Sequence, residues 1–209
     1  MAYDLQEQEQ IDTLKAFWSQ WGKLIGGAVL AVSLGFLGFK GWQYYQRSQA
    51  EAAAVIYSQL ETQLQGAKLD QVKSTVALLQ RDYPSSALSS NAALLAAKLA
   101  FERNDLGFAR AQLKWVLAQQ GDEVVMAVAR LRLATVLLDE KQYDAALAEL
   151  SQPRPAAFDS QFLDLKGDVL VARGDISGAR ESYKAALAKA APDAPARDFI
   201  QTKLDSVGN

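Results

Sequence analysis

The feature that most constrains this chain is an uncharged run near its start, Leu24 to Phe39, between Lys23 and Lys40. As a helix, its 16 residues span about 24 Å, slightly less than a hydrocarbon core of about 30 Å. The apolar stems of the two lysines extend this reach to the headgroups, where aromatic side chains gather. Aromatic residues flank the run, and we expect these at the membrane surfaces: Trp18, Trp21, Trp42, Tyr44 and Tyr45.

A cleaved signal peptide and a buried helix of a soluble core are the alternatives to a membrane span. A signal peptide requires a basic start, whereas the residues before Lys15 carry four acidic side chains and no basic one. The small-x-small sequence Ala50-Glu51-Ala52 lies too far beyond the apolar run for ordinary processing. We therefore expect an uncleaved transmembrane helix over residues 23–45, after a segment over 1–22 and before a domain over 46–209.

Small residues recur along the predicted span at intervals of four, four and three: Gly27, Ala31, Gly35 and Gly38. That spacing places them on one stripe of a helix. Small side chains let two membrane helices approach closely, although glycine is also common in membrane helices in general. The stripe predicts a packing face for a partner helix.

The segment before the span is amphipathic, since apolar residues recur at helical spacing beside polar ones: Ile11, Leu14, Trp18 and Trp21. This pattern predicts a helix at the membrane interface. Two basic residues lie near the span on each side, so the positive-inside rule does not decide the orientation. After the span, no helix breaker occurs between Trp42 and Gly66, so we expect the membrane helix to continue into the next domain.

Residues 51–209 are numerous enough to bury a core of their own. They hold 18 basic and 20 acidic side chains without a block of like charge, which argues against nucleic acid as a partner. The chain has no histidine and no cysteine, which removes most zinc sites and the commonest proton-transfer group and thiol nucleophile. Phosphate-binding and catalytic motifs are absent as well, so we expect neither an enzyme nor a cofactor.

A repeated helical pattern follows residue 66, in which an apolar residue precedes a small or apolar one by three positions. The second members are separated by 37, 37 and 33 residues, close to the tetratricopeptide period of about 34: Val72, Ala109, Ala146 and Ala179. Small residues lie twelve positions before the three alanines, where two helices of one hairpin cross: Ala97, Ala134 and Gly167. The first repeat departs from the pattern at Leu60 and Val72, and Pro153 and Pro155 shorten the third.

Any alanine-rich helical protein gives similar alignments, but turn sequences at matching intervals favour hairpins: Asn104-Asp105, Lys141-Gln142 and Arg173-Gly174-Asp175. Such hairpins stack into an all-α solenoid, and residues 196–207 are expected to form its capping helix. The repeat pattern places a partner groove along the first helices. Its expected lining is Tyr57, Glu61, Leu64, Asn91, Leu94, Lys98, Phe101, Leu131, Thr135, Leu138, Asp164, Asp168 and Val171. Several of these side chains could equally be core.

Four segments of the sequence are distinctive: "IDTLKAFWSQWGK" before the span, "GWQYYQ" after it, and "LKWVLAQ" and "ARLRLATVLLDEKQYDAAL" in the repeats. Through these segments the chain resembles the YfgM-type inner-membrane proteins of Gram-negative bacteria, which are ancillary subunits of the Sec translocon. The resemblance implies a cytoplasmic amino terminus, a periplasmic repeat domain and no catalytic residues. The implied partners are the SecYEG channel, the membrane-anchored chaperone PpiD and the proteins that emerge from the channel.

Three kinds of function are compatible with these features. An adaptor at a membrane complex would bind a few stoichiometric partners through its span and its groove. A holder of apolar peptides would bind many clients weakly. A scaffold of another envelope complex would share the same architecture.

Overall fold

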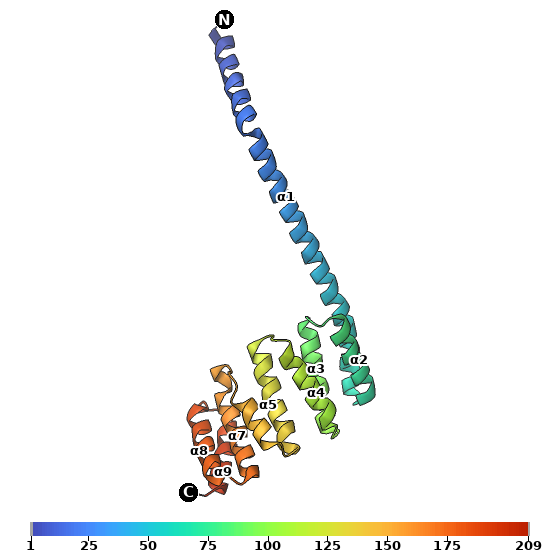
Figure 1. The fold of residues 1–209 in the computed structure, drawn as a ribbon, viewed down its shortest axis with the longest axis vertical. Helices are drawn as coiled ribbons and strands as arrows, with labels where there is room; N and C mark the ends of the chain where they lie inside the picture. The colour runs from blue at the N-terminus through green and yellow to red at the C-terminus, as the bar shows by residue number, and fades with distance from the viewer. Residues whose placement is uncertain (1, 209) are drawn as a thin grey trace. The chain divides into compact units, whose positions relative to one another are not determined.

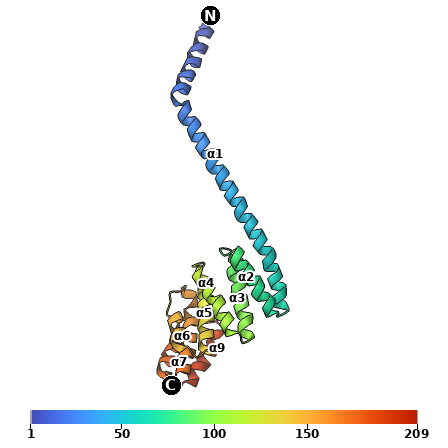
Figure 2. The ribbon, with the colours of Figure 1, turned by 45° about the vertical axis from the view of Figure 1, so that its right-hand side comes forward.

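In the computed structural model of the protein, the backbone is described for residues 2–208 and the side chains for residues 10–208. This part of the chain is helical and contains no strand (Figures 1 and 2). The helices are α1 (Ala2–Gln65), α2 (Leu69–Asp82), α3 (Ala87–Glu102), α4 (Leu106–Ala118), α5 (Glu123–Asp139), α6 (Tyr143–Leu150), η1 (Ala156–Phe158), α7 (Asp159–Arg173), α8 (Ile176–Lys189) and α9 (Ala196–Ser206).

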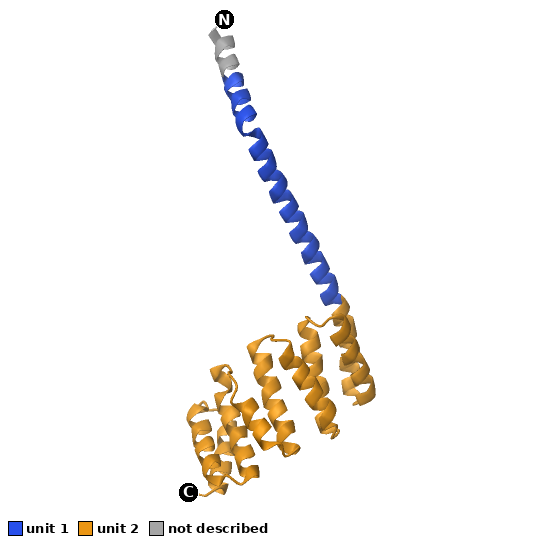
Figure 3. Cartoon of the chain, viewed as in Figure 1, with its two compact units in different colours: residues 1–51 blue, residues 52–209 orange. Residues whose placement is uncertain are grey.

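The chain divides into two compact units, residues 1–51 and 52–209 (Figure 3). The first consists of the earlier part of α1, whose most apolar 18-residue window has a mean hydropathy of 1.7 and no residue buried in the protein. Leu24 is 64% exposed and Val32 is 72% exposed. A helix of a soluble core would bury such side chains, so their exposure argues against the buried-helix alternative. The helix is long and apolar enough to cross a membrane.

Helix α1 continues without interruption to Gln65, as the lack of a breaker before Gly66 predicts. No break therefore marks the predicted boundaries at 22/23 and 45/46. The last part of α1 belongs to the second unit, where Ala53 and Leu60 are fully buried in the core. Gln63 of this part accepts a hydrogen bond of 2.8 Å from the Thr75 hydroxyl on α2.

The second unit consists of helical hairpins followed by α9, which confirms the tetratricopeptide-like architecture. The hairpins pair the end of α1 with α2, α3 with α4, α5 with α6, and α7 with α8 (Figure 1). The first helices of neighbouring hairpins also contact one another, α3 with α5 and α5 with α7. Neighbouring hairpins therefore pack their apolar faces against each other, because a single pair of helices cannot bury its own apolar face.

Each hairpin reverses at a residue with positive φ: Ala67 (49°), Asn104 (60°), Lys141 (59°) and Gly174 (91°). The next backbone N–H then donates to the carbonyl five residues earlier, as from Asp105 to Ala100 at 2.8 Å, and this closes the end of the first helix. The Asp105 and Asp175 side chains accept from the N–H groups of Phe108 and Gly178, which caps the second helix. The predicted turns are therefore confirmed.

The small residues lie at the helix crossings as predicted. Ala97, Ala134 and Gly167 are buried, and so are the alanines they face in the pattern. In the first repeat, Leu60 and Val72 are fully buried at the corresponding positions. The third repeat is the shortest, because α6 ends at Leu150 before the two prolines.

Helix α9 covers the last hairpin. Ile200 is buried, and Leu204 and Val207 pack against the cluster formed by Leu170, Ala179, Tyr183 and Ala186. Phe199 is also a large apolar residue of the predicted capping helix, but it is 74% exposed. The reason is the helical period: positions 200, 204 and 207 share one face, whereas position 199 lies to one side of it.

The crossing of α7 and α8 has no room for a side chain at Gly167. A Cβ there would overlap the ring of Tyr183, which is buried. We expect Gly167→Ala to lower the free energy of unfolding by about 1–3 kcal/mol through overpacking, despite the higher helix propensity of alanine. Thermal or urea unfolding measures the change.

Gly107→Ala is the matched control, because the nearest atom to an added Cβ there is a carboxylate oxygen 4.0 Å away. On helix propensity alone it should stabilise the protein by up to about 1 kcal/mol. If both variants were equally stable, the crossing would have room for a methyl group.

Candidate protein-binding groove

The thirteen residues predicted to line a groove all lie on the first helices of the hairpins: the end of α1, α3, α5 and α7. Their exposure differs. Leu94 is buried, and the exposed ones are Glu61, Asn91, Lys98 and Val171. The half-buried ones are Tyr57, Leu64, Phe101, Leu131, Thr135, Leu138, Asp164 and Asp168. Helices α3, α5 and α7 contact one another in turn, but the side chains predicted for the groove differ in exposure along them.

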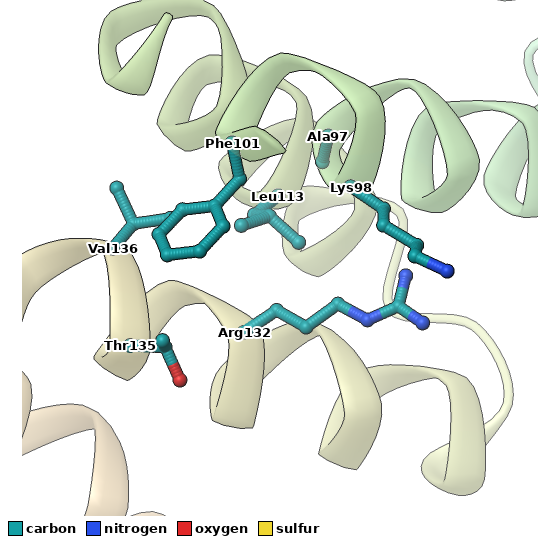
Figure 4. Close-up of a pocket in the computed structure, with 7 residues that line it drawn as sticks. All are labelled: Ala97, Lys98, Phe101, Leu113, Arg132, Thr135 and Val136. Atoms are coloured by element: carbon teal, nitrogen blue, oxygen red, sulfur yellow. The ribbon is translucent and has the colours of Figure 1, made fainter. Parts of the chain in front are cut away.

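A pocket of about 290 Å³ opens between α3, α4 and α5 (Figure 4). It brings together three residues of the predicted groove, Lys98, Phe101 and Thr135. The remaining lining residues were not predicted: Ala97, Leu113, Arg132 and Val136. The pocket is thus built by two neighbouring hairpins.

The two ends of this pocket differ in chemistry. Leu113 and Val136 are almost fully buried, and the half-buried Phe101 ring lies beside Val136 (Figure 4). The side chains of Lys98 and Arg132 extend together toward the other end (Figure 4). The pocket therefore combines an apolar end with a cationic one.

Arg132 crosses from α5 toward α3, where its Nη1 donates a hydrogen bond of 2.9 Å to the Leu94 carbonyl oxygen. Burial lowers the pKa of this guanidinium. The repeat pattern does not predict Arg132 for the groove, because it selects Leu131, Thr135 and Leu138 on the same helix. Its position three residues before Thr135, on a shared helical face, is the signal that could have identified it.

Asp164 and Asp168, also predicted for the groove, are engaged by the capping helix. Lys203 Nζ on α9 lies 2.9 Å from Asp164 Oδ1 and 2.8 Å from Asp168 Oδ2. The Tyr183 hydroxyl on α8 donates to Asp168 Oδ1 at 2.8 Å. These two carboxylates therefore hold the end of the solenoid together.

The pKa values in this cluster follow from burial and pairing. Burial, more than the hydrogen bond to Asp168, raises the pKa of Tyr183. Burial also raises the pKa of Asp164, against the opposing effect of Lys203. For Lys203, burial by itself would lower the pKa, but the bonds to Asp168 and Asp164 outweigh it and raise the pKa above its usual value.

The other predicted residues do not converge on one site. Burial, followed by the charge of Glu61, raises the pKa of Tyr57 in the first hairpin. Asn91 lines a separate pocket with residues of the loop between α4 and α5. Leu64, Leu131 and Leu138 pack against the core. No cluster of acidic side chains in the described part of the chain could hold a metal ion.

The predicted packing stripe of α1 is bare in the single chain. A Cβ added at Gly27, Gly35 or Gly38 would meet nothing within 4 Å, and Ala31 is exposed. The predicted interface aromatics, from Trp18 to Tyr45, are all exposed as well. Both sets are therefore accessible to lipid or to another helix.

The chain is similar over nearly its whole length to known proteins of one family. The sequence profile of a family described as a tetratricopeptide repeat-like domain matches residues 15–209. A protein of Neisseria gonorrhoeae is 38% identical over 208 residues, which covers 99% of this chain and all of the relative. Its name is ancillary SecYEG translocon subunit. The chain belongs to the YfgM family.

Other YfgM-family relatives carry the same name. The protein of Haemophilus influenzae is 34% identical over 89% of this chain and 91% of its own length. The protein of Escherichia coli is 29% identical over 96% of both chains. These matches cover most of each chain, and the family profile over residues 15–209 includes the apolar helix as well as the repeats.

Lys203 provides a test of the structural role of the two aspartates. Replacing it by Lys203→Met leaves two adjacent half-buried carboxylates without a cation, which should destabilise the protein by about 1–2 kcal/mol. Because the pKa of Lys203 is raised by folding, its contribution is complete below the unfolded pKa of about 10.4 and disappears at higher pH. Thermal unfolding and hydrogen exchange of α9 amides measure the effect.

Lys184→Met on α8 serves as the control, because Lys184 is exposed and makes no ion pair in the described part of the chain. Equal melting temperatures and equal α9 exchange in the two variants would mean that Lys203 does not secure the capping helix.

Proposed function

We propose that this YfgM-family protein is a membrane-anchored ancillary subunit of the Sec translocon. The observation that carries the proposal is the near full-length similarity to relatives named ancillary SecYEG translocon subunit. The exposed apolar helix supplies an anchor, and the repeat domain supplies a surface for proteins. Neither the family nor the site geometry calls for catalysis.

In this proposal, residues 1–22 lie on the cytoplasmic side of the bacterial inner membrane, residues 23–45 span it, and residues 46–209 lie in the periplasm. The repeat domain would link the SecYEG channel to the chaperone PpiD and assist proteins that emerge from the channel. The bare stripe on α1 is the candidate docking face for a membrane helix of either partner.

A second candidate function is that of a stand-alone holder of apolar peptides. The apolar end of the pocket at Phe101 favours it. The two functions differ in stoichiometry, because a subunit retains a few partners in fixed ratio, whereas a holder releases a variable mixture of clients.

Purification in mild detergent followed by quantitative mass spectrometry separates these functions. We expect channel subunits in fixed ratio to the protein. The double substitution Ala31→Leu and Gly35→Leu fills the stripe while keeping the span apolar, and it should lower their yield several-fold because two backbones can no longer approach closely.

The matched control is Val29→Leu with Ser33→Leu, which adds leucines on the opposite face of the same helix. Wild-type yield of the partners from the stripe variant would show that the soluble domain holds the complex together. A variable mixture of peptides in place of channel subunits would favour the holder.

The orientation is tested by adding protease to spheroplasts. We expect degradation of the repeat domain before lysis, with a protected fragment that contains the span. Protection of the repeat domain until the cells are lysed would reverse the assignment.

A further inference from the structure

Of the two cations at the cationic end of the pocket, Arg132 has no acidic partner among the described residues, and Lys98 has a distant one. Lys98 and Arg132 extend to the same end from two different helices (Figure 4). Within residues 10–208, the acidic contact of Lys98 is a long one, 3.8 Å to Glu102 on an exposed surface. Among the described residues, no carboxylate lies within 4 Å of Arg132. Two neighbouring cations without an intervening acid form a site that favours an anion.

Arg132 is the stronger reason to expect an anion here, because it is half-buried and no carboxylate of the described residues compensates its charge. A guanidinium has five N–H donors, and the recorded hydrogen bond engages Nη1 alone. In the described part of the chain, the buried donors without a partner belong to Arg130, so the unused donors of Arg132 remain accessible from solvent. A carboxylate is the partner whose geometry fits this fork best.

The other end of the pocket selects an apolar group. Phe101, Leu113 and Val136 provide its surface, and the volume of about 290 Å³ is near the lower limit of roughly 300–1,000 Å³ for small-molecule sites. This space suits one large side chain. Since the cations lie at the opposite end of the same pocket, the apolar group and the carboxylate must be close neighbours in the ligand.

We propose that the pocket binds an extended peptide segment in which a large apolar side chain adjoins a carboxylate. The apolar side chain contacts Phe101 and Val136, and the carboxylate bonds to Arg132 and Lys98. The inference extends the proposed function by naming the chemistry of the segment that the groove recognises.

The test uses the full chain in nanodiscs of phosphatidylcholine, which offer no anionic headgroup. The probe is an acetylated and amidated ten-residue peptide of glycine and serine with a central leucine followed by glutamate, titrated by calorimetry. Matched peptides carry glutamine for glutamate, or serine for leucine. We expect both to bind at least about fivefold more weakly, since each loses a charge-assisted hydrogen bond or the buried side chain.

Protein variants assign the effect to the cations. Arg132→Gln and Lys98→Gln should each weaken binding of the glutamate peptide by about fivefold or more and leave binding of the glutamine peptide unchanged. Lys114→Gln is the control, since Lys114 is an exposed lysine of α4 outside the pocket. If Arg132→Gln fails to fold by circular dichroism, Lys98→Gln decides, because Lys98 is exposed.

Equal affinity for the glutamate and glutamine peptides would overturn the inference, and so would the absence of saturable binding. A doubled mass in light scattering, with loss of peptide binding as the protein concentration rises, would place a second copy in the pocket and also overturn it.

Copurification of channel subunits is measured separately. Failure of peptide binding with retained subunits rejects the inference alone, whereas loss of subunits with retained peptide binding rejects the proposed function.

Discussion

The close crossing of the two helices in the second, third and fourth hairpins is the contact on which most of the repeat domain depends. It is possible because small residues occupy the crossings, such as Ala97, Ala134 and Gly167. Close approach excludes water from the apolar faces, and each hairpin then shares its remaining apolar face with the next. At the α7–α8 crossing, the ring of Tyr183 occupies the space that a side chain at position 167 would need. The absence of a side chain at Gly167 therefore leaves the space that the Tyr183 ring fills.

Stacking also creates the pocket. Phe101 and Arg132 are far apart in sequence, yet they line one cavity because α3 and α5 are first helices of adjacent hairpins. The same stacking leaves Arg132 with a backbone carbonyl as its partner and without a carboxylate among the described residues. Burying the charged guanidinium of Arg132 without a carboxylate costs desolvation free energy. An anion that binds to Arg132 can offset this cost.

The end of a solenoid presents a different problem, because the last hairpin has no successor to cover its apolar face. Helix α9 covers this face. Ile200 is buried in the core, and Lys203 forms ion pairs with two carboxylates of α7. The opposite end of the repeat domain is closed by the last part of α1, through Ala53 and Leu60. One helix thus contributes both the candidate membrane span and half of the first hairpin.

The sequence by itself determined the helical class, the repeat period, the hairpin turns and the capping helix, because these follow from local periodicity and backbone preferences near each residue. Asn104 and Gly174 turn the chain where their own conformational freedom allows it. The sequence also predicted a groove along the first helices. Only the tertiary structure decided which groove residues meet. It assigned Asp164 and Asp168 to Lys203, left Phe199 exposed, and brought the unpredicted Arg132 beside Lys98. The physical reason is that contacts between hairpins depend on how far each helix rotates and slides against the next, which periodicity along one helix does not specify.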